Sequence, residues 1–226
     1  AAARQLELGS IDAAIVGGVD TLCLTTLYGF ASLQLTSAQP CRPYDAARNG
    51  ISVGEGAAFA LLERAGDPAP GSVLLLGTGE SSDAYHMSSP HPEGLGARLA
   101  MEAALRSAGL ATADIGYINL HGTATPANDA AEGKAVAALF GNTVPCSSTK
   151  GATGHTLGAA GAVEAVICAL ALSDGFLPGS PGTQNLDPAM RLDYLLQGKA
   201  ATVRHALSNS FGFGGSNCSL ILGVAP

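Results

Sequence analysis

Two short glycine-rich segments stand out in this chain: His121-Gly122-Thr123-Ala124-Thr125-Pro126 and Lys150-Gly151-Ala152-Thr153-Gly154-His155. Each follows a run typical of a β-strand, at residues 115–120 and 144–149, and each leads into a run typical of a helix. The loop after the carboxyl end of a strand is where open α/β sheets bind their ligands. We therefore expect His121 and His155 to converge on one site.

The rest of the chain repeats this alternation of strands and helices. Strand-like runs cover residues 11–19, 54–64, 73–77 and 205–222, and the last run is a pair of strands joined by the glycine-rich residues 210–216. Helical runs cover residues 93–109, 129–140 and 157–172. Strands alternating with helices predict an α/β fold with a mixed, mostly parallel sheet that helices cover on its faces.

Three of these elements carry finer expectations. Residues 11–19 are nearly all apolar or small, which predicts a buried strand. The spacing of Asp129 and Glu132 is that of a capping box, which predicts that a helix begins at Asp129 and runs to Phe140. Residues 157–172 are apolar nearly all round, as expected of a core helix.

A linker rich in proline and glycine, at residues 66–71, is the best candidate for a boundary in the chain. It divides the sequence into residues 1–70 and residues 71–226. The first nine residues have the composition of the last turns of a helix that ends at Gly9. We therefore expect this sequence to be the remainder of a longer chain.

The composition predicts a protein with little free surface. Hydrophobic residues make up 47% of the 226 residues and charged residues only 13%, so much of the chain is expected to be buried within something larger. The formal net charge of −7 argues against nucleic acid as a partner. Five cysteines without CxxC spacing are expected to be reduced thiols, which indicates the cytoplasm. The longest apolar run contains Glu164 and is shorter than the roughly 20 residues of a membrane span, so no span is expected.

The histidines are the first candidates for chemistry. A lone histidine is usually structural, but His121 and His155 both lie in glycine-rich loops beside threonines, which favours a role in catalysis. No carboxylate or cysteine stands at ligand spacing from either of them, so no metal site is expected. We interpret His86, His91 and His205 as surface or structural residues.

Other residues near these loops allow two interpretations each. Lys150 is either a solvated lysine or the partner of Glu164, the one charge on an apolar helix, and we favour the ion pair because a buried carboxylate needs a partner. Asp129 and Glu132 are interpreted as helix caps and not as acid–base catalysts. The loop of residues 211–215 is either an ordinary turn or a source of backbone N–H groups for an oxyanion hole, with Gly212 and Gly214 allowing close approach.

Taken together, these segments resemble the β-ketoacyl-acyl-carrier-protein synthases, which are condensing enzymes of the thiolase superfamily. The resemblance spans the whole chain and implies a thiolase-like layered αβαβα fold. It rests on seven segments in order: VGGVD at residues 16–20, RPYD at 42–45 with RNG at 48–50, GEGA at 54–57, SSDAYHM at 81–87, HGTATPAND at 121–129, residues 150–164, and NSFGFGG at 209–215.

The resemblance implies a decarboxylative Claisen condensation between malonyl-carrier protein and an acyl thioester on a cysteine. It assigns His121 and His155 as the histidines of a Cys-His-His triad, and Lys150 as an active-site lysine paired with Glu164. Four further residues are implied near the substrate: Thr123, Thr125 and Ser88 along the phosphopantetheine arm, and Phe213 as a gating aromatic whose N–H contributes to the oxyanion hole. No dissociable cofactor is implied, because the acyl carrier protein brings the phosphopantetheine. A dimer is implied as well.

The chain also departs from that family. The motif of the nucleophilic cysteine is absent, and Asn49 replaces the usual aspartate of the Arg-Asp-Gly segment. Residues 1–70 are therefore expected to be the remnant of the N-terminal ketosynthase half and residues 71–226 the C-terminal half. The chain alone is expected to be inactive and to need the missing half or a partner ketosynthase chain. Two alternatives stay open: a non-catalytic partner subunit like the chain-length factors, and a thiolase.

Overall fold

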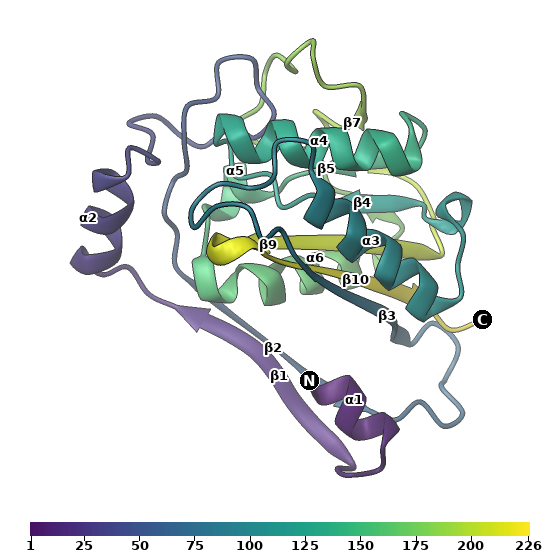
Figure 1. The fold of residues 1–226 in the computed structure, drawn as a ribbon. Coiled ribbons are helices and arrows are strands. Elements are labelled where there is room, and N and C mark those ends of the chain that lie inside the picture. Colours follow the sequence, from purple (N-terminus) through teal and green to yellow (C-terminus); the bar gives the residue numbers. More distant parts are fainter.

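The computed structural model describes residues 1–226, and its centre is a six-stranded mixed sheet (Figure 1). The strand order is β3-β10-β9-β4-β5-β7. β10 is antiparallel to both β3 and β9, and the pairs β9–β4, β4–β5 and β5–β7 are parallel. The strands are β3 Val73–Ser82, β4 Tyr117–Asn119, β5 Pro145–Ser147, β7 Asp193–Tyr194, β9 His205–Gly212 and β10 Ser216–Val224. The predicted mixed sheet and the predicted pair β9–β10 are thus confirmed.

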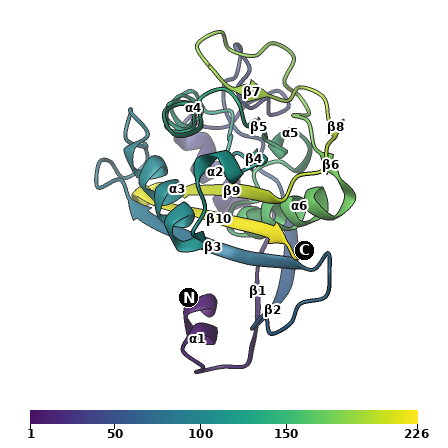
Figure 2. The same ribbon diagram turned by 90° about the vertical axis from the view of Figure 1, so that its right-hand side faces the viewer.

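Helices cover both faces of this sheet. α3 (Leu95–Ala108) and α4 (Pro126–Phe140) lie on one face and α6 (Ala160–Asp174) on the other (Figure 2). Neighbouring residues of a strand point to opposite faces, so Leu207 of β9 packs in the cluster with α3 and α4, while Ala206 packs in the cluster with α6. α3 approaches the sheet closely, because a Cβ at Gly79 of β3 would lie 1.9 Å from the carbonyl oxygen of Ala100.

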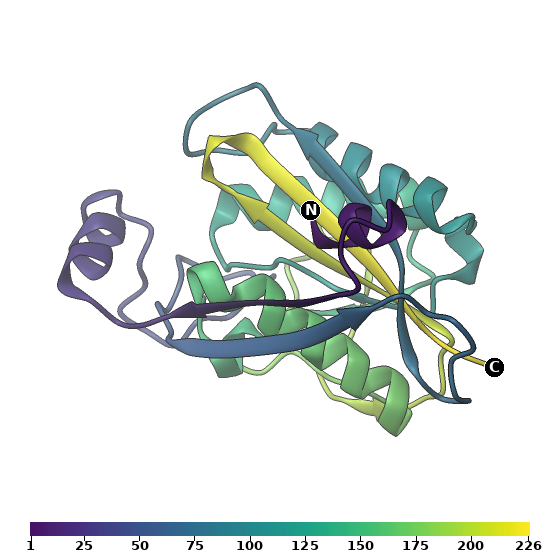
Figure 3. The same cartoon turned by 90° about the horizontal axis from the view of Figure 1, so that it is seen from below.

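A two-stranded antiparallel ribbon, β1 (Ala13–Asp20) with β2 (Gly56–Glu63), packs against α6 away from the main sheet (Figure 3). Its inner face carries mostly small residues, and a Cβ at Gly18 would lie 2.2 Å from the carbonyl oxygen of Gly158. Its outer face is open to solvent and apolar, with Ile15, Val19, Phe59 and Leu61 all 60% exposed or more. The prediction of a buried strand at residues 11–19 was therefore wrong for one face, because nothing in the described chain covers it.

The remaining elements are short. α1 (Ala2–Glu7) packs on the ribbon, and α2 (Leu24–Ser32) projects from the end of the ribbon with no buried residue (Figure 1). α5 (Lys150–Thr153) follows β5, and β6 (Phe176–Leu177) pairs with β8 (Lys199–Ala200). The linker predicted as a boundary, residues 66–71, is an irregular connection between β2 and β3.

The start of α4 differs from the expectation. The helix begins at Pro126 with Thr125 as its N-cap residue, one turn earlier than the predicted capping box. Proline is well tolerated in the first helical turn because it has no N–H to lose there. Asp129 and Glu132 therefore lie inside the helix, where both are buried. They do not cap α4, and their hydrogen bonds instead go to the loop that precedes it.

The apolar segment of residues 157–174 is the core helix α6 with the short turn before it. By length and composition alone this segment could cross a membrane. In this fold its inner side packs on β9 and β10, and its one charge, Glu164, pairs with Lys150 inside the protein. The outer side is partly open, since Leu170 is 54% exposed.

Candidate active site

One large cavity, of about 890 Å³, opens where the loops after β4 and β5 meet the β9–β10 turn. Most of the residues predicted for the site lie on its wall, and the structure brings them together from distant parts of the sequence. The predicted residues that line it are Ser88, His121, Thr123, Thr125, His155, Gly212 and Phe213. Lys150 and Glu164 lie buried beneath this wall.

The two histidines are in contact. The ring centroids of His121 and His155 are 5.2 Å apart, and the ring planes meet at 81°. The ring of Phe211 packs edge-on against His121, with centroids 5.6 Å apart. His121 is only 5% exposed, so both the rotation of its ring and its contact with water are limited.

Hydrogen bonds fix the ring proton of each histidine. The backbone N–H of Leu157 donates to Nδ1 of His155 over 3.3 Å, and the Lys150 ammonium lies 3.4 Å from Nδ1 of His121. An ammonium and a backbone N–H can only donate, so Nδ1 accepts in both rings and the proton lies on Nε2. Each neutral ring therefore offers a single N–H donor, at Nε2.

The surroundings keep both rings neutral. Burial lowers the pKa of His121 well below its ordinary value, and the charge of Lys150 and the neighbouring His155 lower it further. Burial and Lys150 lower the pKa of His155 to about 3. At neutral pH the cavity wall thus holds two uncharged N–H donors side by side, which suits the stabilisation of an oxyanion.

The predicted ion pair between Lys150 and Glu164 is present. Lys150 is fully buried, and its ammonium bonds both the carboxylate of Glu164 and the carbonyl oxygen of His121. Burial outweighs the effect of the Lys150 ammonium, which favours the ionised form, and raises the pKa of Glu164 to about 7. The pair connects α6 to the first histidine loop and places a positive charge directly behind His121.

Two carboxylates shape the loop that carries His121. Glu132 accepts the N–H groups of His121 and Gly122, each over 2.8 Å, and Asp129 accepts those of Thr123 (3.0 Å) and Ala124 (3.2 Å). These bonds replace the strand or helix pairing that the loop lacks. The sequence interpretation as helix caps missed this role, although two carboxylates in an alanine-rich buried helix were a signal that they serve a nearby backbone.

A second segment holds the other histidine. The backbone N–H of His155 donates to the carbonyl oxygen of Ser52 over 2.7 Å, and its carbonyl accepts the N–H of Gly54 over 3.0 Å. This bridge involves only backbone atoms, so no pattern of residue types predicts it. Residues 41–54, which we call the strap, also supply Tyr44, whose hydroxyl donates to Glu132 over 2.9 Å.

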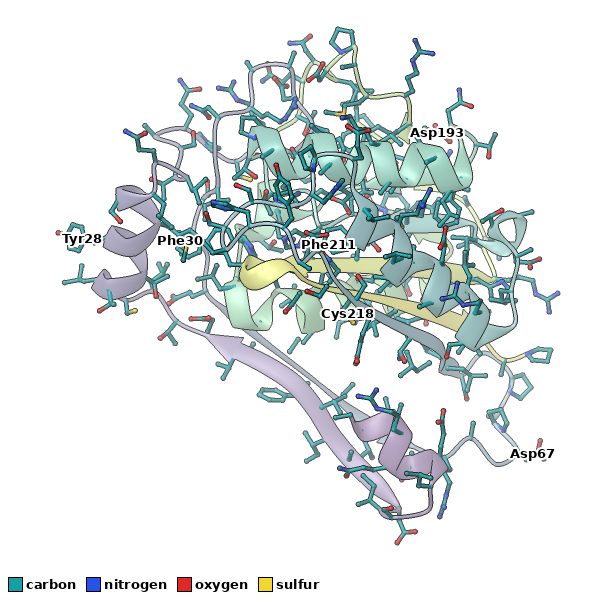
Figure 4. The ribbon with its side chains drawn as sticks, in the orientation of Figure 1. Tyr28, Phe30, Asp67, Asp193, Phe211 and Cys218 are labelled. Atoms are coloured by element: carbon teal, nitrogen blue, oxygen red, sulfur yellow. The ribbon has the colours of Figure 1, made fainter.

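The β9–β10 turn forms one side of the cavity. Phe213 is 51% exposed, and its ring centroid lies 5.8 Å from that of Phe30 on α2. Figure 4 shows Phe30 on the side of α2 that faces the body, with Tyr28 on the outer side. Gly214 does not line the cavity, and its N–H donates to the carbonyl oxygen of Met87 over 2.8 Å. In this structure its N–H therefore anchors the neighbouring loop and is not free for a substrate.

Polar groups on the wall are partly paired with one another. The hydroxyls of Thr123 and Thr125 lie 2.8 Å apart, and the N–H of Ser88 donates to the ring of His86 over 3.2 Å. Thr123, Thr125 and Ser88 all line the cavity.

The cysteines do not form a nucleophilic pair with the histidines. All five are free thiols, and only Cys218 lines the cavity. Burial and the charge of Glu80 raise the pKa of Cys218, so its thiol stays protonated and is a weak nucleophile. Cys41 is buried behind the loop of Thr123 and points its thiol at that residue's carbonyl oxygen. No group of three His, Cys, Asp or Glu side chains is placed to hold a metal ion.

Comparison with known proteins gives consistent matches over nearly the whole chain. The sequence model of the beta-ketoacyl synthase N-terminal domain matches residues 1–67, and that of the C-terminal domain matches residues 73–184. A 3-oxoacyl-[acyl-carrier-protein] synthase 2 from Rhizobium meliloti is 42% identical over 98% of this chain and 56% of its own length.

Solved structures are similar in fold as well as in sequence. A ketosynthase in complex with its chain length factor from Xenorhabdus doucetiae is 50% identical, with a TM-score of 0.94 over 99% of this chain and 56% of that one. A chain in the solved complex of a type II polyketide synthase acyl carrier protein with its ketosynthase is 26% identical to this one. Its TM-score is 0.94 over 100% of this chain and 59% of that one. The chain thus spans little more than half the length of the relatives that it matches.

Proposed function

This chain belongs to the β-ketoacyl synthase family and has its thiolase-like α/β fold, and we propose on that premise that it forms the part of a β-ketoacyl-acyl-carrier-protein synthase that decarboxylates the malonyl unit. The complete enzyme is an acyltransferase that extends an acyl chain by decarboxylative Claisen condensation. The relatives are longer than this chain. The cysteine that carries the acyl thioester is proposed to lie in the part of the enzyme that this chain does not span.

One observation carries the proposal: two histidines lie in edge-on contact in the wall of one cavity, each with a hydrogen-bond donor beside Nδ1, which leaves Nε2 to carry the proton. Loss of CO2 from a malonyl thioester leaves the electron pair of the broken C–C bond as an enolate, whose charge rests on the thioester oxygen. Two N–H donors stabilise that oxygen without a prior proton transfer. Lys150 adds positive charge behind His121 and keeps both rings neutral.

The condensation then follows from the enolate. Its carbon attacks the carbonyl carbon of the acyl thioester, a new C–C bond forms, and the C–S bond to the cysteine breaks with the electron pair leaving on sulfur. Thr123, Thr125 and Ser88 are proposed to bond the phosphopantetheine arm of the carrier protein. Phe213 is proposed to gate the cavity, and the N–H groups at Gly212 and Phe213 to hold the acyl oxygen.

The proposed partners are an acyl carrier protein and a second ketosynthase-like subunit. Support comes from the solved relatives, one of which is bound to a chain length factor and another to an acyl carrier protein. The proposed location is the cytoplasm, which agrees with five free thiols. Two other functions remain as outcomes of the test, a chain-length-factor-like subunit without activity and a thiolase acting on coenzyme A thioesters.

The test measures CO2 release from malonyl-carrier protein by the full-length protein that carries this chain. His121→Ala and His155→Ala should each lower the rate about 100- to 1000-fold, because each removes an oxyanion donor. His205→Ala, outside the cavity, is the control. Wild-type rates in both site variants would contradict the proposal. If the wild-type protein releases no CO2, it is a chain-length-factor-like subunit, or a thiolase if it condenses acetyl-CoA.

A further inference from the structure

Tyr44 occupies an unusual position in the strap. It is fully buried, yet its φ of +62° lies in the left-handed region that residues with a side chain rarely adopt. Strained backbone of this kind persists where surrounding contacts hold it. The N–H of Tyr44 donates to Asp129 over 2.8 Å, and its carbonyl accepts the N–H of Asp187 over 2.9 Å.

The hydroxyl of Tyr44 completes a cage around Glu132. One carboxylate oxygen accepts the N–H of His121 and the side-chain amide of Asn209, and the other accepts the N–H of Gly122 and the Tyr44 hydroxyl. Glu132 is 1% exposed. A buried carboxylate stays charged and in place only while such donors surround it. The Tyr44 hydroxyl therefore helps to keep the Glu132 carboxylate where it can accept the N–H groups of His121 and Gly122.

The loop that Glu132 holds lies outside regular secondary structure, and bonds to Glu132, Asp129 and Lys150 hold it in place. Gly122 has a φ of +39° and Ala124 a φ of +65°, and neither lies in a strand or helix. A Cβ at Gly122 would lie 3.3 Å from the ring of Tyr44, so the ring also limits where the loop backbone can move. Through Glu132, the hydroxyl of Tyr44 acts on the backbone that positions the ring of His121.

We propose that Tyr44 is a positioning residue, which sets the first histidine loop by donating its hydroxyl to Glu132. The proposal rests on the proposed function, because it assigns the held ring to the oxyanion site. In the sequence, Tyr44 stands out only as part of the RPYD segment at residues 42–45.

Several charged and titratable groups near Glu132 influence its pKa, and with it the effect of removing the Tyr44 hydroxyl. They are Asp129 on the same helix, Cys146 on β5, the His121 loop, and the Lys150–Glu164 pair beyond it. The Tyr44 hydroxyl favours the charged form of Glu132, whereas burial raises the pKa of Glu132. Removing the hydroxyl should raise that pKa further, so that the loop loosens at a higher pH than before.

The test is Tyr44→Phe in the full-length protein, which keeps the ring and removes only the hydroxyl. The matched control is Tyr194→Phe, whose ring packs 5.1 Å from that of Tyr44 and whose hydroxyl donates to the carbonyl oxygen of Pro43 and not to a carboxylate. Two quantities are measured: hydrogen exchange of the backbone amides of His121 and Gly122, and the pH profile of CO2 release from malonyl-carrier protein.

Tyr44→Phe should speed exchange of these two amides about tenfold, as expected for the loss of a hydrogen bond to a charged group. The acid limb of its CO2-release profile should move up by about one pH unit. Tyr194→Phe should change neither quantity. Unchanged exchange in Tyr44→Phe, or an equal change in both variants, would overturn the positioning role. Hydrogen exchange does not depend on activity. If the wild-type protein releases no CO2, the proposed function is refuted, and the exchange result alone decides the positioning role of Tyr44.

Discussion

Beneath the cavity wall, Lys150, Glu164 of α6 and the His121 carbonyl group form the floor of the candidate active site, whereas the β1–β2 ribbon packs against another part of α6. The two regions differ in whether their side chains find partners within the chain. In the floor, Lys150 is fully buried and bonds both Glu164 and the His121 carbonyl. On the outer face of the ribbon, Ile15 is 79% exposed and Leu61 is 62% exposed. Polar groups are thus buried with partners in one region, while apolar groups lie in solvent in the other.

This contrast separates two kinds of structural information. The floor is held by contacts within the chain, because the Lys150 ammonium bonds both the Glu164 carboxylate and the His121 carbonyl oxygen. The ribbon has a defined register along all eight residue pairs, but its outer face has nothing in the described chain to pack against. Secondary structure therefore forms locally in both regions, whereas burial is complete only in the floor.

The largest expected effect comes from breaking the floor. Lys150→Met should lower the free energy of unfolding by about 3–5 kcal/mol, because the buried carboxyl group of Glu164 loses its partner and must either stay charged without it or take up a proton. The measurement is urea unfolding at pH 7.5. The control, Lys134→Met, removes an exposed lysine from its pair with Glu93 and should cost no more than about 1 kcal/mol. Equal losses in the two variants would mean that the buried pair has no special weight.

A smaller effect should appear when the pH is lowered. The folded pKa of His155, about 3, lies below its unfolded value of about 6.5. The unfolded chain therefore binds a proton first, so the contribution of this neutral histidine to stability is complete above about pH 6.5 and is lost as the pH falls.

His155→Asn removes this pH-dependent contribution. Between pH 7.5 and pH 5.0 the wild-type protein should lose about 1–2 kcal/mol more unfolding free energy than the variant does. Urea unfolding at the two pH values measures this difference, with His86→Asn, a substitution on the exposed surface, as the control. A variant that parallels the wild-type protein at both pH values would show that the buried ring does not stay neutral.

The Lys150–Glu164 pair of the floor could be predicted from the sequence, because a buried charged residue requires a partner of opposite charge. A single carboxylate on an apolar helix needs a partner, and Lys150 was the charged residue closest to the histidines. Likewise, histidines after two neighbouring parallel strands must meet at one edge of the sheet. The mixed sheet and the β9–β10 pair followed from the alternation of strand and helix patterns.

Other features could not be predicted because they depend on tertiary contacts. The capping-box spacing of Asp129 and Glu132 predicts local bonds to the helix start, but Pro126 starts the helix earlier and both carboxylates hold the His121 loop instead. The bonds from Ser52 and Gly54 to His155 use only backbone atoms and leave no pattern in the sequence. An apolar strand such as residues 13–20 predicts burial, but which face is covered depends on what packs against it.

The smallest expected change in stability concerns the ribbon, and two adjacent leucines test it. Leu61 points outward, whereas Leu62 points toward the α6 side and is partly buried. Leu61→Ser should change the free energy of unfolding by no more than about 0.5 kcal/mol, because its side chain is already largely in solvent. Leu62→Ser should cost about 1–2 kcal/mol, since it removes apolar contact from the inner face.

Self-association, measured by sedimentation, should show the opposite order of the two variants. Exposed apolar faces and free strand edges favour association, so Leu61→Ser should lower self-association of the purified chain more than Leu62→Ser does. If Leu61→Ser proves the more destabilising of the two, the outer face is covered in solution and the contrast between ribbon and floor is lost.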